Sequence, residues 1–131
     1  MITENVRNHA WVKLVMKRRL IFLNALPLNS IPLDHFCIDV RRQGIKDIEY
    51  DIKKAKSINA EIISYIRHEA TLNLLNKIFN LNLVSSPGLY QWRENDEIIV
   101  ITLKRGILLD IHEVESEDLE IFYVYVSKMC Y

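Results

Sequence analysis

A histidine at the start of a predicted helix is the residue of this chain best suited to chemistry. Positions 62–66 are mainly apolar, and after Arg67 and His68 the spacing becomes that of an amphipathic helix. His68, Glu69 and Thr71 therefore lie where a strand or loop turns into a helix. Helix N-termini attract phosphates, and a histidine there can also transfer a proton. The alternative interpretation is a capped core helix with an incidental histidine.

Length and composition indicate one ordered domain. The 131 residues are 50% hydrophobic and 26% charged, with three glycines and three prolines, which favours an α/β or α+β protein over a disordered or fibrous one. The formal net charge is zero, so nucleic acid is not the favoured partner and no membrane partner is expected. We predict a basic N-terminal extension or helix at 1–18 and a single domain at 19–131.

The cysteines and the apolar runs bear on the compartment. Cys37 and Cys130 have no zinc-ligand spacing, so we expect no metal and two free thiols in a reducing cytosol, with a disulfide left open. No signal peptide and no apolar run of membrane-spanning length is visible, which predicts a soluble, cytoplasmic protein.

Apolar periodicity and turn residues predict the elements that must position the histidine. Helices are expected at 46–57 and after His68, a short strand or loop at 62–66, and a helical turn at 116–118. Turns or loops are expected at 26–33, 41–44 and 85–88, and the predicted strands are 20–23, 35–40, 89–93, 97–104 and 120–127. The strands at 89–93 and 97–104 should form a hairpin. The expected fold class is α/β (α+β), a single domain with a mixed sheet of about five strands flanked by two or three helices.

Four stretches of the chain follow one another in an order typical of a known family. LIFLNALPLNS at 20–30 is an apolar strand ending in Asn24 and a loop of small residues, and IRHEAT at 66–71 places His68 at a helix start. An acidic turn at 95–96 precedes an apolar strand, and an aromatic strand ends at Val126. Over about four fifths of its length the chain resembles the viral ring nucleases, small type III anti-CRISPR proteins found largely in archaeal viruses.

The resemblance implies a function and a mechanism. Members of this family are homodimers that bind cyclic tetra-adenylate in a pocket shared by both subunits and cut it without a metal or other cofactor. A ribose 2′-hydroxyl attacks the neighbouring phosphate, and the motif histidine protonates the 5′-oxygen that leaves. Such chemistry requires in-line positioning, a proton donor and positive charge near the phosphate.

Carried over to this chain, the resemblance implies His68 as the general acid and Arg105 as a second catalytic residue. The implied ligand-binding residues are Asn24, Asn29, Ser30, Arg67, Glu69, Ala70, Thr71 and Lys104. Asn24 with Asn29 or Ser30 would contact ribose or base, and the N–H groups of residues 69–71, with the Thr71 hydroxyl, would hold a phosphate.

The chain departs from the family pattern at three places. The glycine before the motif histidine is Arg67 here, and the turn at 85–88 lacks the usual arginine. The family's catalytic loop, QRLxEG, is matched only by LKRG at 103–106, without its glutamate. Two alternatives to the enzyme follow: a sponge that holds the cyclic nucleotide without cutting it, and a viral interaction protein that uses its basic N-terminus.

Overall fold

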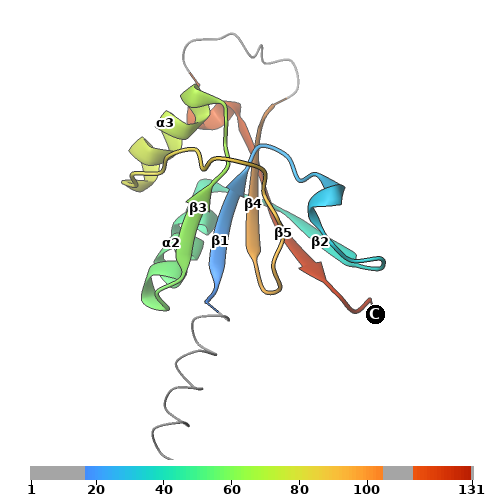
Figure 1. The fold of residues 1–131 in the computed structure, drawn as a ribbon. Coiled ribbons are helices and arrows are strands. Elements are labelled where there is room, and N and C mark those ends of the chain that lie inside the picture. Colours follow the sequence, from blue (N-terminus) through green and yellow to red (C-terminus); the bar gives the residue numbers. More distant parts are fainter. Residues whose placement is uncertain (1–16, 105–113, 131) are drawn as a thin grey trace, which may run out of the picture.

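The chain folds around one mixed sheet of five strands. In this computed structural model, residues 17–104 and 114–130 are described, and the strands lie in the order β2-β5-β4-β1-β3 (Figure 1). The strands are β1 Arg19–Leu23, β2 Cys37–Gln43, β3 Glu61–Ser64, β4 Glu97–Leu103 and β5 Leu119–Ser127. The helices are α2 Ile45–Ser57 and α3 Glu69–Phe79, with short 3-10 helices η1 Leu28–Ser30 and η2 Ser116–Asp118. The predicted fold class, with a single mixed sheet, is confirmed.

The strand directions bring the ends of several strands together along one side of the sheet. β1 runs parallel to both β3 and β4, whereas β5 is antiparallel to β4 and to β2. The carboxyl ends of β1, β3 and β4 therefore meet along one edge of the sheet, which runs across the strand ends and is distinct from the outer strands β2 and β3. β5 begins at this same edge. β1 is buried along its whole length, as its unbroken apolar run requires of a central parallel strand.

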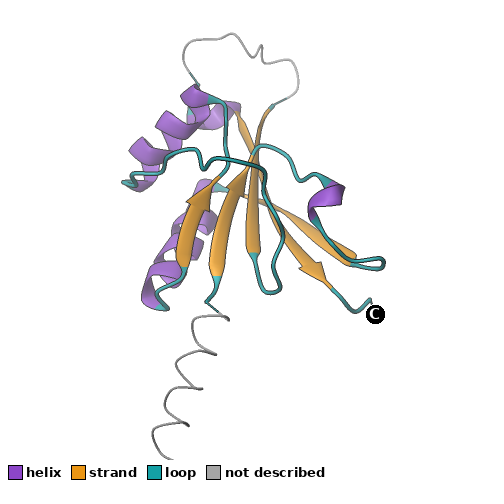
Figure 2. Ribbon diagram, viewed as in Figure 1, coloured by secondary structure: helices purple, strands orange, loops and turns teal. Residues whose placement is uncertain are grey.

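The two faces of the sheet are covered differently. Both helices lie on one face, where buried residues such as Ile48 and Leu75 pack against Phe22 and its neighbours (Figure 2). The other face is covered by loop residues, including Ile31 and Trp92. Helix residues lie on one side of the carboxyl ends of β1, β3 and β4, and loop residues lie on the other side.

The strand predicted at 89–93 is wrong, and so is its hairpin with β4. Tyr90 and Trp92 are buried in alternation, but they pack on the loop-covered face of the sheet instead of joining it. The backbone N–H of Trp92 donates to the carbonyl of Ser30 at 2.9 Å, so this segment is bound to another loop. Alternate side chains are buried here although the segment pairs with no strand. The sequence pattern is the same for such a segment as for a strand.

The predicted turn at 41–44 is also wrong in its first three residues. β2 continues through Gln43, which pairs with Ile121 of β5. The chain changes direction only at Gly44, whose N–H donates to the Asp47 carboxylate at 2.8 Å as α2 begins. Pairing along β5 extended the strand beyond the point at which its apolar residues end.

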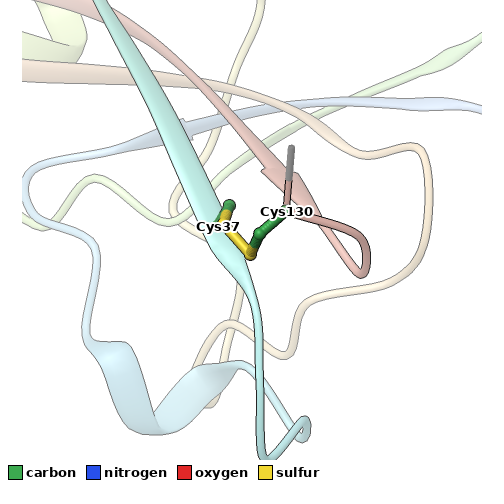
Figure 3. Close-up of a disulfide and its surroundings, with 2 residues drawn as sticks. All are labelled: Cys37 and Cys130. Carbon is green, nitrogen blue, oxygen red and sulfur yellow. A yellow bond between two sulfur atoms is a disulfide. The ribbon is translucent and has the colours of Figure 1, made fainter.

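The two cysteines are joined, which corrects the expectation of free thiols. Cys37 at the start of β2 pairs in register with Ser127, and the chain after β5 brings Cys130 back so that the two Cα atoms are 5.5 Å apart (Figure 3). The disulfide fastens the segment after β5 to the edge strand of the sheet. The sequence separation of 93 between the two cysteines hid this pairing from the sequence.

None of the helices in the described ranges is long and apolar enough to cross a bilayer.

Candidate functional site

Asn24 joins three stretches of the chain at the shared sheet edge. It follows directly after β1, and its side-chain oxygen accepts a hydrogen bond from the Arg67 N–H at 3.0 Å. Its side-chain amide donates to the carbonyl of Ile101 on β4, at 3.4 Å. The end of β1, the approach to α3 and the long strand β4 therefore meet around one amide side chain.

His68 stands at the N-terminus of α3, as the change of period predicted. It is the residue before the first helical one, in extended backbone, and its carbonyl accepts the Leu72 N–H at 3.1 Å. Its ring nitrogen Nδ1 lies 2.7 Å from the hydroxyl of Thr71, which is itself buried. This contact fixes the orientation of the imidazole relative to the first turn of the helix.

The first turn of α3 contains both favourable and unfavourable features for an anion. The helix is 11 residues long, so its N-terminus carries a substantial partial positive charge. Backbone N–H groups of Glu69, Ala70 and Thr71 belong to this turn and have no partner within the helix ladder. The exposed carboxylate of Glu69 lies in the same turn, and its negative charge disfavours binding of an anion there.

The side chain of Arg67 is directed to the turn that follows α3. Its guanidinium donates to the Ser85 hydroxyl and to the carbonyls of Ser86 and Gly88. Gly88 has φ +80°, in the left-handed region that glycine tolerates. Sequence reasoning identified both Arg67 and the turn at 85–88, but it did not connect them.

The two loop residues implied as base or ribose contacts are placed differently. Asn29 is exposed on η1, whereas Ser30 is buried and its hydroxyl donates to the Pro27 carbonyl at 2.6 Å. The Ser30 side chain therefore closes its own turn. Of the two alternatives, Asn29 is the one whose side chain is presented to solvent.

Lys104 follows β4 at the same sheet edge, and its N–H donates to the Asp118 carbonyl of η2 at 2.8 Å. Its side chain is exposed. Arg105, the other cation implied by the resemblance, lies outside the described residues. The structure thus brings Asn24, Arg67, His68 and Lys104 to one edge of the sheet.

A hollow of about 760 Å³ lies beside this edge, between α3 and residues 114–117. Ala70, Leu74 and Lys77 line one wall, and Val114 and Glu117 line the other. His68 is not among its lining residues, so the hollow and the histidine are separate features. Within the part of the chain that the structure describes, no group of three or more His, Cys, Asp or Glu side chains is arranged to hold a metal ion.

Sequence reasoning did not anticipate the supporting contacts of the site. Ser64 at the end of β3 is buried, and its hydroxyl accepts the Ile66 N–H at 3.1 Å, which anchors the segment leading to His68. Ser85 and Ser86 carry the turn that Arg67 binds, and the N–H of Ser86 donates to the Ser64 carbonyl at 2.8 Å. The contacts of the 85–88 turn with Ser64 and Arg67 join residues about twenty positions apart, so no local sequence pattern indicates them.

Comparison with solved structures gives a likeness in fold. No protein-family model matches the sequence, and no curated protein matches it. Among solved structures, B116 of Sulfolobus turreted icosahedral virus is similar, with a TM-score of 0.64 and 17% sequence identity. The match covers 83% of this chain and 98% of that chain. At this identity the likeness shows a shared fold.

Proposed function

We propose that this chain is a protein of an archaeal virus that binds a cyclic oligoadenylate and cleaves it without a metal. The likeness to a Sulfolobus virus protein supports the origin, since the two chains share a fold over most of their lengths. The observation that carries the proposal is the convergence at Asn24. Three motifs on which the resemblance to viral ring nucleases depends are joined there by two hydrogen bonds.

The proposed reaction uses groups of this chain in simple roles. A phosphate of the ligand lies at the N-terminus of α3, against the backbone N–H groups of residues 69–71. The ribose 2′-hydroxyl attacks the phosphorus and gives up its proton to water, so that a 2′,3′-cyclic phosphate forms as the bond to the 5′-oxygen breaks. His68 supplies the proton that the 5′-oxygen takes up and regains one from solvent. Asn24 and Asn29 contact ribose or base, and Lys104 and Arg105 supply positive charge.

The contact between His68 and Thr71 gives this mechanism a structural basis. A histidine acts as general acid only when its ring is held toward the leaving group. The 2.7 Å contact from Nδ1 to the Thr71 hydroxyl holds the imidazole at the helix start. Thr71 is thus proposed as a positioning residue for the acid.

The position of Arg67 favours a second candidate function, binding without turnover. Its guanidinium donates to three groups of the 85–88 turn. A cation engaged in this way still adds local positive charge, which favours binding of an anion. It is less suited to stabilise the negative charge that develops on a phosphate in the transition state, because its N–H donors already have partners.

Incubation of the full chain with labelled cyclic tetra-adenylate in EDTA, beside a binding assay, tests the proposal. Linear products are expected from the wild type. His68→Ala should lower the cleavage rate at least about a hundredfold while leaving the affinity within a few-fold, because loss of a general acid typically costs 10²–10⁴ in rate. Tight binding without products would support the sponge, and absence of binding would contradict both.

Thr71→Val tests the positioning role, because valine has nearly the same shape as threonine but no hydroxyl. We expect Thr71→Val to lower kcat while KM for the cyclic nucleotide stays within a few-fold, since the His68 ring loses the contact that orients it. Thr71→Ser, which keeps the hydroxyl, is the matched control and should restore the wild-type kcat. An unchanged kcat in Thr71→Val would remove this role.

A further inference from the structure

The edge strand β2 is long and regular, and three of its residues, Asp39, Arg41 and Arg42, are charged. It has seven residues and pairs continuously with β5, from Cys37 opposite Ser127 to Gln43 opposite Ile121, without a bulge. It contains no proline and no lysine. Within residues 17–104 and 114–130, β5 is its one strand partner, so its outer backbone groups are presented at the edge of the sheet (Figure 1).

The opposite edge of the sheet is protected. β3 has four residues, and its last residue, Ser64, forms a bridge with Ser85. The N–H of Ser86 also donates to the Ser64 carbonyl. Among the residues that the structure describes, β2 is therefore the longer of the two edges and has no strand or bridge on its outer side.

Side chains on β2 are complementary to themselves under a two-fold rotation. If two copies of the strand pair antiparallel with Val40 opposite Val40, Asp39 of each copy stands opposite Arg41 of the other. Asp39 and Arg41 lie on one face of the strand, 3.2 Å apart, with side chains 59% and 68% exposed. Val40 is 55% exposed on the other face, so each copy offers an apolar side chain at the two-fold axis.

Both ends of β2 have contacts that support the strand before any pairing. The disulfide from Cys37 to Cys130 fastens one end of β2. Near the other end, Arg42 contacts the Glu120 carboxylate at 3.2 Å and lies over the ring of Phe122. A pre-organised strand loses little conformational entropy when it pairs.

From these observations we propose that β2 is a self-association surface, where a second copy of the chain pairs antiparallel about Val40 and extends the sheet to ten strands. This assembly does not depend on the function proposed above. β3, whose end leads to His68, is four strand positions from β2, or about 19 Å. Pairing at β2 therefore keeps the two histidines far apart and forms no pocket shared between them.

Charge reversal tests the interface by concentration-dependent sedimentation of the full, ligand-free chain. Asp39→Arg or Arg41→Asp places like charges opposite each other and should raise the dimer dissociation constant at least about tenfold. The double variant restores opposite charges and should recover wild-type association. Lys53→Glu, an exposed reversal on α2, is the matched control and should leave association unchanged.

A cross-link tests the register. With Val40→Cys, the introduced thiols face each other at the two-fold axis and should form a disulfide-linked dimer on mild oxidation. With Arg42→Cys they are separated by about 14 Å along the strand and should not. A wild type that stays monomeric up to about 1 mM, single reversals without effect, or equal cross-linking of the two cysteine variants would each overturn the proposal.

Discussion

Asp51 on α2 is a carboxylate in an environment that disfavours its charge. It lines a hollow of about 440 Å³ together with Gln43, Glu97 and Tyr123, at the end of the sheet away from His68. Its Oδ2 atom is buried and accepts no hydrogen bond from any residue in 17–104 or 114–130. Loss of hydration, and then the nearby charge of Glu97, raise the pKa of Asp51 to about 6.

This shift predicts how stability depends on pH. The folded chain holds the Asp51 proton more tightly than the unfolded chain, whose carboxyl keeps its ordinary pKa of 3.8. The contribution of Asp51 to stability is therefore fully present below that value and is lost as pH rises through about 6.

Asp51→Asn should remove this dependence. We expect the variant to be more stable than the wild type by about 1 kcal/mol near pH 8, with no such gain near pH 4; the value is below the full shift because Asp51 is partly exposed. Urea unfolding at the two pH values measures the difference. Asp47→Asn is unsuitable as a control because Asp47 caps α2, so exposed Glu49→Gln is the better choice and should show equal effects at both.

Arg67 shows how one side chain can hold a distant turn. Its guanidinium reaches three acceptors at once because its donors are arranged in a planar fork, which an ammonium group cannot reproduce. Arg67→Lys should therefore loosen the 85–88 turn while costing about 1 kcal/mol or less in global stability. Amide hydrogen exchange of residues 84–89 would show the loss of protection, and unchanged exchange there would contradict the prediction.

At the scale of elements, the segment from Tyr90 to Asp96 is organised by a buried ion pair. The Arg19 guanidinium, at the start of β1, donates to both oxygens of Asp96, at 2.9 and 2.5 Å. Asp96 also accepts the Tyr90 hydroxyl at 2.6 Å and the Arg93 N–H at 3.0 Å. Burial, and then the hydrogen bond from its hydroxyl to the Asp96 carboxylate, raise the pKa of Tyr90 well above its ordinary value.

Removing this carboxylate should be costly. Asp96→Ala leaves the guanidinium of Arg19, which is 8% exposed, without its charged partner, so we expect a loss of about 3 to 5 kcal/mol in the free energy of unfolding. Glu94→Ala breaks an exposed pair with Lys128 and should cost less than about 1 kcal/mol. Urea denaturation compares the two, and similar losses would show that the buried network is not the main support of this segment.

For the whole molecule, the disulfide is a constraint between residues very far apart in the chain. It joins Cys37 to Cys130 across 93 residues and so ties the sheet edge to the end of the chain. The double variant Cys37→Ser with Cys130→Ser should lose about 2 to 4 kcal/mol in the free energy of unfolding, because the unfolded chain regains conformational freedom. A reductant should lower the wild-type melting temperature to that of the variant and leave the variant unchanged. Equal melting of oxidised and reduced wild type would contradict this.

The shared-pocket homodimer that the resemblance implies stays a prediction. Any dimer that holds one ligand between two copies of His68 must use the sheet edge at which α3 begins, whereas the surface proposed above uses β2. The two assemblies are distinguished by ligand: cyclic tetra-adenylate should promote the first and leave the second unaffected.

What the sequence determined by itself is local. Unbroken apolar runs marked β1 and β4, helical spacing marked α2 and α3, and the change of period at Arg67 placed His68 at a helix start. These signals are strong because side-chain burial repeats with the period of the backbone.

What only the tertiary structure decided is which distant groups meet. Alternating burial at 89–93 belonged to a loop because Asp96 pairs with Arg19 and Trp92 bonds to Ser30, neither of which is visible locally. The disulfide, the hold of Arg67 on its turn and the joining role of Asn24 likewise depend on strand order. Contacts between residues far apart in the chain arise from the packing of the whole sheet, and no periodicity records them.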